Sequence, residues 1–227
     1  MTTKTAKPPA QLTEKAQAYN ASRIHAHNTL RRLGWWPFVS QPGSAAEVAE
    51  IVAFQTQNKL TADGAAGPAV FAALRRLHAA ARGWRLELPH GIQAIEQAYG
   101  PPGKGKTVKV PIFPGTGRAV GFHVSVANEL ATLLEIAADM SGYTPADIQT
   151  INVRKKRGGD NPGDDWSVHS YAAAFDADPS RNPWGNKPSS PLIRFPAFLE
   201  VFRALGWRCG ADWKTPDTMH VQACTGY

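Results

Sequence analysis

The first third of the chain repeats apolar positions at helical spacing. Residues 11–33 contain neither Gly nor Pro, and their apolar side chains recur near helical spacing until a Gly-Trp-Trp-Pro sequence ends the pattern. A second helical pattern begins at Ser44, which has capping-box spacing to Glu47, and it runs towards Leu60. A third begins at Pro68, a residue type favoured in the first turn of a helix. The pattern predicts a small all-α domain of three helices.

The rest of the chain mixes helical patterns with short apolar runs and segments rich in Gly and Pro, which is typical of an α+β domain. The sequence predicts helices at 91–99, 124–141 and 195–205, and strands at 108–113, 148–153, 172–178 and 219–224. We therefore expect two domains: the three-helix domain over residues 1–80 and an α+β domain over residues 81–227. A linker is expected at about residues 81–90.

Composition and charge limit the classes of protein to which the chain can belong. With 227 residues, 43% of them hydrophobic and 19% charged, the chain can bury a core, and its two Cys are too few for a disulfide framework. The formal net charge is +7, with most of the excess in residues 1–80. This charge favours a polyanionic partner such as nucleic acid, a cell-wall polymer or an anionic membrane face, although a solvated basic surface explains it equally well. We expect neither a membrane span nor a secretory signal, because no apolar run is long enough.

One segment matches a nucleotide-binding pattern. Residues 100–107 read Gly-Pro-Pro-Gly-Lys-Gly-Lys-Thr, which fits the phosphate-binding loop G-x-x-x-x-G-K-[ST]. That loop needs a strand before it and a helix after it, whereas here a helix is predicted before it and a strand after it. Pro101 and Pro102 also remove two backbone N–H donors. The sequence therefore argues against a nucleotide site.

Candidate metal ligands lie in two segments of the second domain. His169 and Asp176 are close together in the sequence, and His220 follows some forty residues later. Two imidazoles and one carboxylate can hold a catalytic zinc and leave a fourth position for water. Zinc lowers the pKa of such a water and polarises a carbonyl group, and a nearby carboxylate must then accept the water's proton. Asp217, three residues before His220, is the candidate for this general base.

These residues lie in motifs that resemble a family of cell-wall peptidases. The chain contains four separated motifs, in the order Ser167-Val-His169, Ala174-Phe-Asp176, Gly210-Ala-Asp-Trp213 and Asp217-Thr-Met-His220. They resemble the zinc D-alanyl-D-alanine carboxypeptidases and L-alanyl-D-glutamate endopeptidases, phage endolysins among them, which cut peptidoglycan stem peptides. The resemblance covers roughly residues 88–224. It implies an α+β zinc peptidase domain, with Zn²⁺ held by His169, Asp176 and His220 and with Asp217 as the catalytic base.

The resemblance also implies an arginine that binds the substrate carbonyl or carboxylate and steadies the developing oxyanion. Arg154, which closes a predicted strand, fits that position, with Arg157 as the alternative, although residues 154–157 can also be a solvated basic run. Two positions depart from the family pattern: Ala172 replaces the usual Gly, and Gln222 replaces a Glu that often follows the last His. Because Ala tolerates a positive φ poorly, the first departure bears on the turn near the ligands. Neither departure removes a ligand.

The first domain has a resemblance of its own. Phe54-Gln55, residues 60–64, Gly67-Pro68 and Leu74 resemble the signature of the three-helix peptidoglycan-binding domain. Turn chemistry alone explains the Gly and Pro residues of this signature, so it indicates a fold rather than a set of ligand contacts. The resemblance implies a wall-anchoring domain that raises the local substrate concentration for the hydrolase tethered to it.

The two cysteines leave three possibilities open. Cys209 and Cys224 flank the last two motifs, and they can form a disulfide if their segments pair as an antiparallel hairpin. Two buried thiols are an equal alternative, and Cys224 as a zinc ligand is a third. Trp166, Trp184 and Trp213 lie near the motifs, where they can line a groove or belong to the core.

Together these features predict a peptidoglycan hydrolase of the endolysin type, in which zinc-activated water cleaves an amide bond of the stem peptide. We expect a monomer that is made in the cytoplasm without a signal peptide and acts at the bacterial cell wall with a holin-like release partner. It should bind peptidoglycan but no nucleic acid, and should not insert stably into a membrane. The alternatives are a non-catalytic wall-binding protein with a structural zinc and a basic nucleic-acid-binding protein. L-Ala–D-Glu, D-Ala–D-Ala and D-Ala–diaminopimelate bonds all remain candidates.

Overall fold

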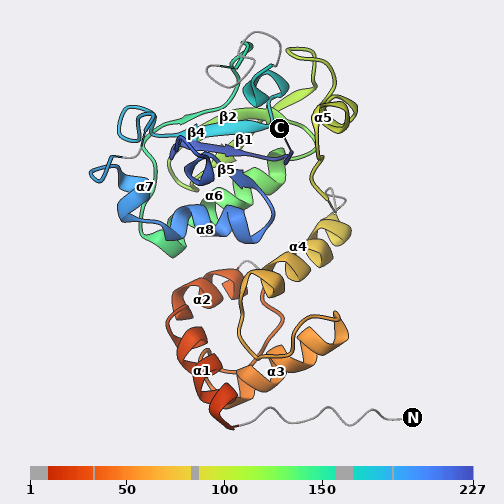
Figure 1. Ribbon diagram of the computed structural model, residues 1–227, viewed down its shortest axis with the longest axis vertical. Helices are drawn as coiled ribbons and strands as arrows, with labels where there is room; N and C mark the ends of the chain where they lie inside the picture. Colours follow the sequence, from red (N-terminus) through yellow and green to blue (C-terminus); the bar gives the residue numbers. More distant parts are fainter. Residues whose placement is uncertain (1–9, 33, 83–86, 157–165, 186, 227) are drawn as a thin grey trace. The chain divides into compact units, whose positions relative to one another are not determined.

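The chain divides into two compact units (Figure 1). The computed structural model describes residues 10–32, 34–82, 87–156, 166–185 and 187–226. Unit 1 comprises Met1–His78 and unit 2 comprises Ala79–Tyr227, so the predicted linker at about 81–90 falls partly outside the described residues. The mixed α+β architecture predicted from the sequence is confirmed.

Unit 1 has four helices among its described residues, rather than the three predicted. They are α1 (Ala10–Ala21), α2 (Ile24–Arg32), α3 (Ala45–Gln57) and α4 (Pro68–Arg82), the last of which continues into unit 2. The single helix predicted over residues 11–33 is wrong, because the chain turns at Ser22 and Arg23. The Ser22 hydroxyl donates to the Tyr19 carbonyl at 2.6 Å. A serine side chain bonded to the preceding turn competes with helix continuation, and this break needs no Gly or Pro.

The helix starts predicted at Ser44 and Pro68 are confirmed. Ser44 Oγ accepts the Glu47 N–H at 3.1 Å, and the Glu47 carboxylate accepts the Gly43 N–H at 2.7 Å. This capping box satisfies backbone donors at the start of α3. Pro68 is the first residue of α4, where its missing N–H costs no hydrogen bond.

Side chains from two helices hold the turn between α3 and α4. Gln55 of α3 accepts the Gly64 N–H at 2.8 Å and donates to Asp63 at 2.7 Å. From α1, Asn20 donates to the Gly64 carbonyl at 3.0 Å and accepts the Ala66 N–H at 2.9 Å. Hydrogen bonding within the fold therefore accounts for the Gln and Asp-Gly positions of the N-terminal signature.

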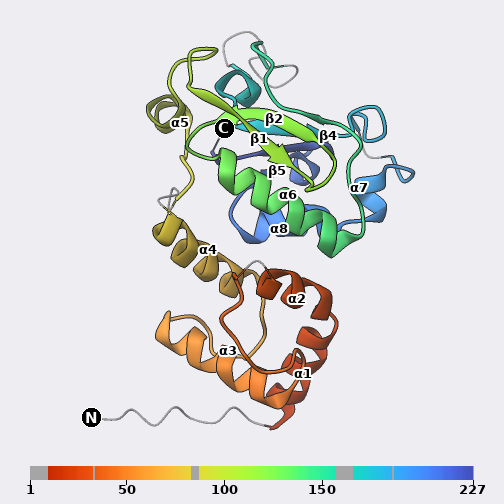
Figure 2. The ribbon, with the colours of Figure 1, turned by 180° about the vertical axis from the view of Figure 1, so that it is seen from behind.

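The described residues of unit 2 form two sheets and the helices that cover them. Its helices are α5 (Ile92–Tyr99), α6 (Ala127–Ser141), α7 (Pro191–Arg194) and α8 (Ala197–Ala204), with the 3₁₀ helices η1 (Val168–Tyr171) and η2 (Gly210–Asp212). Its strands are β1 (Thr107–Ile112), β2 (Arg118–His123), β3 (Ile148–Gln149), β4 (Ala174–Ala177), β5 (Arg208–Cys209) and β6 (His220–Gln222). β1 and β2 form an antiparallel pair, and the other strands form an antiparallel sheet in the order β3-β4-β6-β5. Helix α6 packs on β1 and β2, and α8 packs on α6 (Figure 2).

The core of unit 2 follows the predicted helical periodicity. Leu130, Leu133 and Leu134 of α6 are fully buried, as are Phe198 and Phe202 of α8. The predicted strand at 148–153 is wrong beyond residue 149, where the β3 ladder ends. Strand β2 was not predicted, because its first two positions are not buried and a Gly interrupts the buried positions that follow.

The segment that matches the phosphate-binding pattern lies between α5 and β1, in the reversed order predicted from the sequence. Its backbone takes part in the fold: the Gly103 N–H donates to the Ser170 carbonyl at 2.7 Å. Because a strand rather than a helix leaves the loop, no helix N-terminus follows it to face a phosphate.

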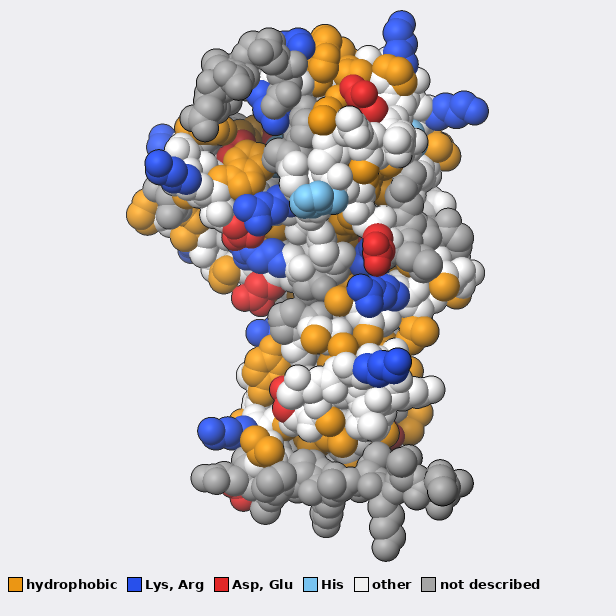
Figure 3. Space-filling view, turned by 45° about the vertical axis from the view of Figure 1, so that its right-hand side comes forward, with side chains coloured by type: hydrophobic (Ala, Val, Ile, Leu, Met, Phe, Trp, Pro, Cys, Tyr) orange, Lys and Arg blue, Asp and Glu red, His pale blue; other side chains and the backbone are white. Residues whose placement is uncertain are grey.

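The surface gives two further observations. None of the described helices has the length and apolar character needed to cross a membrane. Figure 3 shows one face of the molecule, on which Lys and Arg side chains are dispersed among hydrophobic and uncharged ones. On this face the excess positive charge therefore does not single out one polyanion-binding patch.

Candidate metal centre

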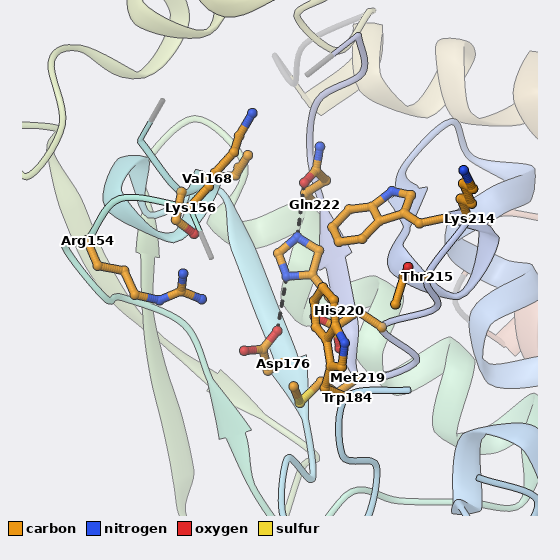
Figure 4. A pocket seen from close by; sticks show the side chains of 13 residues that line it. Arg154, Lys156, Val168, Asp176, Trp184, Lys214, Thr215, Met219, His220 and Gln222 are labelled. Atoms are coloured by element: carbon orange, nitrogen blue, oxygen red, sulfur yellow. Dashed lines mark hydrogen bonds and ion pairs between the residues drawn. The ribbon is translucent and has the colours of Figure 1, made fainter. Parts of the chain in front are cut away.

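Three elements of unit 2 bring the candidate ligands together. Asp176 on β4 and His220 on β6 are register partners in the antiparallel ladder, so their side chains project from the same face of the sheet. His169 lies in η1, immediately before the turn that leads into β4. Figure 4 shows Asp176 and His220 side by side in a cleft, joined by a dashed line.

The turn after His169 requires a left-handed residue. Ala172 has φ 52° and ψ 34°, and its N–H donates to the His169 carbonyl at 3.1 Å. Its own carbonyl accepts the His123 N–H at 2.8 Å. The position that is Gly in the family pattern thus needs the left-handed region in this chain also. Ala adopts it here at a cost of about 1–2 kcal/mol.

The three candidate ligand atoms form a small triangle. His169 Nε2 lies 3.2 Å from Asp176 Oδ1 and 3.1 Å from His220 Nδ1, and the remaining side of the triangle is 3.1 Å. In a tetrahedral zinc site with bonds of about 2.0–2.2 Å, ligand atoms lie roughly 3.3–3.6 Å apart. The triangle is therefore close to the size that zinc requires, and these residues could hold such an ion.

Hydrogen bonds on the far side of each ring determine which nitrogen faces the triangle. His169 Nδ1 is 2.5 Å from the Thr150 carbonyl, and His220 Nε2 is 3.0 Å from Gln222 Oε1. Both partners are acceptors, so these ring nitrogens carry the hydrogens and the opposite nitrogens of the neutral rings present lone pairs. Two lone pairs and a carboxylate oxygen at 3.1–3.2 Å repel one another unless a cation lies among them. The donor set therefore fits a metal ion.

The amide of Gln222 is held in this orientation from the other side. Gln222 Nε2 donates to the Cys224 carbonyl at 3.4 Å and contacts Cys224 Sγ at 3.3 Å. Its oxygen is thereby left to face His220. Sequence reasoning noted Gln222 only as a departure from the family pattern, although its i+2 spacing from His220 on a strand places both side chains on one face. Thr150 was missed because it contributes a backbone carbonyl, which the sequence does not distinguish.

The two carboxyl groups of the site have opposite pKa shifts. Burial works against the charge of Asp176, but hydrogen bonds and charge from the His169 and His220 rings, in their protonated forms, lower its pKa overall. Burial raises the pKa of Asp217, and the nearby charge of Asp176 adds to this effect, while His220 opposes it. Asp217 Oδ1 is buried and accepts no hydrogen bond from any described residue. Asp217 is therefore suited to holding and releasing a proton, whereas Asp176 is suited to staying ionised.

A close approach of the backbone explains the Gly of the third motif. The Asp217 N–H donates to the Gly210 carbonyl at 2.9 Å, and the His220 N–H donates to the Asp217 carbonyl at 3.1 Å. A Cβ at position 210 would lie 2.5 Å from the Asp217 carbonyl oxygen and 3.1 Å from His220 Cβ. Any side chain there would displace the turn that carries Asp217 and His220.

The cleft over these residues has a volume of about 780 Å³ and brings the predicted substrate arginine to the same place. Figure 4 shows Arg154 and Lys156 on one side of His220 and Lys214 on the other. Trp184, Trp213 and Asp217 also line the cleft, whereas Trp166 lies against the Lys155 ammonium, 4.4 Å from its ring centre. Arg157, the alternative to Arg154, lies outside the described residues.

The two cysteines are free and buried. The β5–β6 register pairs Cys209 with Val221, so Cys224 does not lie opposite it. Burial raises the pKa of both thiols to about 12, which keeps them protonated and unreactive. Of the three possibilities that the sequence left open, the structure has two buried thiols.

Comparison with known proteins bears on the same segment. A protein-family model described as D-alanyl-D-alanine carboxypeptidase matches residues 160–223. The match includes His169, Asp176, Asp217 and His220, whereas Arg154 precedes it. No curated protein and no solved structure matches the chain. The family match supports a peptidase assignment for this part of unit 2 and suggests amide hydrolysis related to peptidoglycan.

Proposed function

We propose that this protein is a peptidoglycan hydrolase of the endolysin type, whose unit 2 cleaves an amide bond of the stem peptide and holds Zn²⁺ between His169, Asp176 and His220. The observation that carries the proposal is the convergence of three lone-pair atoms at 3.1–3.2 Å, two of them from Asp176 and His220, which line a cleft together with Asp217 and Arg154. The family match at residues 160–223 supports the same chemistry.

In this proposal the metal ion supplies Lewis-acid chemistry: it lowers the pKa of a water molecule and polarises the scissile carbonyl. Asp217 accepts the proton of the attacking water and delivers it to the departing amine nitrogen. Its burial and its unpartnered Oδ1 support this role, because a desolvated carboxyl of raised pKa exchanges protons more readily near neutral pH.

Arg154 has the complementary role of binding the carbonyl oxygen as negative charge develops on it. Figure 4 shows its guanidinium group directed towards Asp176 across the cleft. Arg154 Nη1 donates to the Lys155 carbonyl at 3.2 Å, which limits the directions the side chain can take. A guanidinium held in place before the reaction stabilises an oxyanion without reorganisation.

Unit 1 is proposed to bind the wall. The N-terminal signature at residues 54–74 supports this role, which would raise the concentration of stem peptides around unit 2. We propose that the protein acts at the bacterial cell wall as a monomer and reaches it with a holin-like partner.

The test is digestion of purified peptidoglycan, followed by mass spectrometry of the released peptides and new amine ends. Wild type should release fragments, a chelator should abolish release, and zinc should restore it. Asp217→Asn should retain zinc but hydrolyse about 10²–10⁴-fold more slowly. Asp212→Asn is the matched control, because its carboxylate pairs with Arg203 at the partly exposed surface, 2.7 Å away.

The opposite outcome is equally specific. If zinc-loaded wild type sediments with several wall types and yet releases no fragments from them, this result would contradict the hydrolase proposal and favour the non-catalytic wall-binding alternative. The bond that is cut follows from the new ends: a free D-Glu amine indicates the L-Ala–D-Glu bond, a free diaminopimelate amine the D-Ala–diaminopimelate bond, and released D-Ala the D-Ala–D-Ala bond.

A further inference from the structure

We propose that Ser170 is a positioning residue that fixes the backbone of Arg154 to the turn carrying His169, and that the loop at residues 100–106 braces this contact. The inference rests on the proposed role of Arg154 in binding substrate. Ser170 does not belong to the residues that the family resemblance assigns, and it contributes no atom to the metal triangle.

Ser170 bonds both backbone groups of Arg154. The Arg154 N–H donates to Ser170 Oγ at 2.9 Å, and Ser170 Oγ lies 2.9 Å from the Arg154 carbonyl. The hydroxyl has one hydrogen, and the Asn152 carbonyl is farther away, at 3.3 Å, so its favoured acceptor is Arg154. The side chain is buried, with 2% of Ser170 exposed, so water cannot easily replace these bonds.

The segment before the cleft has few other attachments. The β3 ladder ends at Gln149, and residues 150–154 continue without regular strand pairing. Hydrogen bonds join these residues to η1 and the residue before it instead. The Thr150 carbonyl accepts from the His169 ring, and the Arg154 carbonyl accepts the Ser167 N–H at 2.9 Å. The Ser170 side chain therefore holds the Arg154 end of residues 150–154 against the η1 turn.

The glycine-rich loop at residues 100–106 contacts both Ser170 and the residue before Arg154. The Gly103 N–H donates to the Ser170 carbonyl at 2.7 Å. The Val153 side chain lies against the same glycine, where an added Cβ would be 3.2 Å from Val153 Cγ1. The loop that matches a phosphate-binding pattern thus supports the turn and the residue next to Arg154.

These contacts separate two properties of the site. His169 is held at the metal triangle by the bond from its ring to the Thr150 carbonyl, whereas the Arg154 backbone is held by the Ser170 hydroxyl and the Ser167 N–H. Loss of the hydroxyl should therefore misplace Arg154 while the metal ligands remain. A displacement of about 1 Å in a substrate-positioning group is enough to lower the rate substantially.

A double-mutant cycle tests this inference. Ser170→Ala should lower kcat/KM on a stem peptide about tenfold, mainly through kcat, with the zinc Kd unchanged. In an Arg154→Ala background, Ser170→Ala should cause no further loss, since the group it positions is absent. Ser170→Thr keeps the hydroxyl and should recover most of the activity. Equal losses in both backgrounds, or a weaker zinc Kd that accounts for the loss, would overturn the inference.

Hydrogen exchange provides a readout that needs no substrate. The Arg154 amide should exchange about tenfold faster in Ser170→Ala than in wild type, and Ser170→Thr should restore its protection. Unchanged exchange would refute the positioning role even if the protein hydrolyses peptidoglycan. Faster exchange in a protein that hydrolyses nothing would instead support the contact between Ser170 and the Arg154 backbone and refute the proposed function.

Discussion

Asp176 and His220 are direct register partners on β4 and β6, with Oδ1 and Nδ1 3.1 Å apart. The backbone ladder of the sheet therefore sets the spacing of these two ligand atoms. His169 joins them differently, through the left-handed turn at Ala172 and the bond from its ring to the Thr150 carbonyl. The candidate centre thus depends on one rigid pairing and one turn, and substitutions at each should have different effects.

Gln222→Ala should weaken zinc binding by about 10- to 100-fold, because His220 loses the acceptor that fixes its ring and tautomer. Gln222→Glu keeps an acceptor and adds negative charge, so it should bind zinc at least as tightly as wild type. Competition with a chromogenic chelator gives the Kd values. Gln93→Ala, on the exposed face of α5, is the control. Equal affinities for the Ala variant and wild type would contradict the role assigned to Gln222.

Gly210→Ala should reduce both zinc affinity and hydrolysis, because its Cβ would come within 2.5 Å of the Asp217 carbonyl oxygen. Overpacking of this kind costs about 1–3 kcal/mol of stability. Gly67→Ala is the matched control, since a Cβ at position 67 would lie 3.9 Å from the Tyr19 hydroxyl oxygen, at an ordinary contact distance. Thermal unfolding and zinc titration of both variants test the prediction, and a Gly210→Ala protein that keeps wild-type zinc affinity would refute it.

The free energy of unfolding of the Ala172→Gly protein should exceed that of the Ala173→Gly protein by about 1–2 kcal/mol, because Gly at position 172 removes the cost of holding Ala in the left-handed region. Both residues are buried and lose the same methyl group, but only Ala172 has a positive φ among these two. Urea unfolding of the metal-free proteins gives the two free energies. If the two variants are equally destabilised, the turn before β4 does not store this strain.

Acidification should destabilise unit 1 through His27. Burial, together with the charges of Arg23 and Arg31, lowers the pKa of His27 from 6.5 to about 4. The unfolded chain therefore binds this proton first, so stability that is complete above about pH 6.5 is lost as the pH falls towards 4, by about 3 kcal/mol.

The measurement is the Tm of wild type and His27→Gln at pH values from 7.5 to 4.5. The His27 ring stacks on the Trp36 ring, with their centres 4.2 Å apart, and His27 Nδ1 lies 3.2 Å from Glu47 Oε1. Burial raises the pKa of Glu47 itself. The difference between the two proteins isolates His27 from the titration of Glu47. Parallel Tm curves would show that His27 does not titrate as described.

The sequence predicted best where local chemistry decides the structure. The capping box at Ser44, the helix start at Pro68 and the apolar faces of α6 and α8 depend on neighbouring residues, and all are present. The break at Ser22 and the end of β3 at Gln149 depend on contacts that periodicity does not encode. In the candidate site, side-chain chemistry identified the ligand types, whereas the contributions of Thr150 and Ser170 came from tertiary contacts.

Strand β6 is the last described strand along the chain, yet it lies inside its sheet, between β4 and β5. It supplies His220 and forms the ladder with both neighbours. During translation, β4 and β5 emerge from the ribosome before the strand that joins them, so the sheet closes only after residues 220–222 have been made. We expect the nascent chain to gain its complete ligand set only after His220 has left the ribosome, although His169 and Asp176 have emerged earlier.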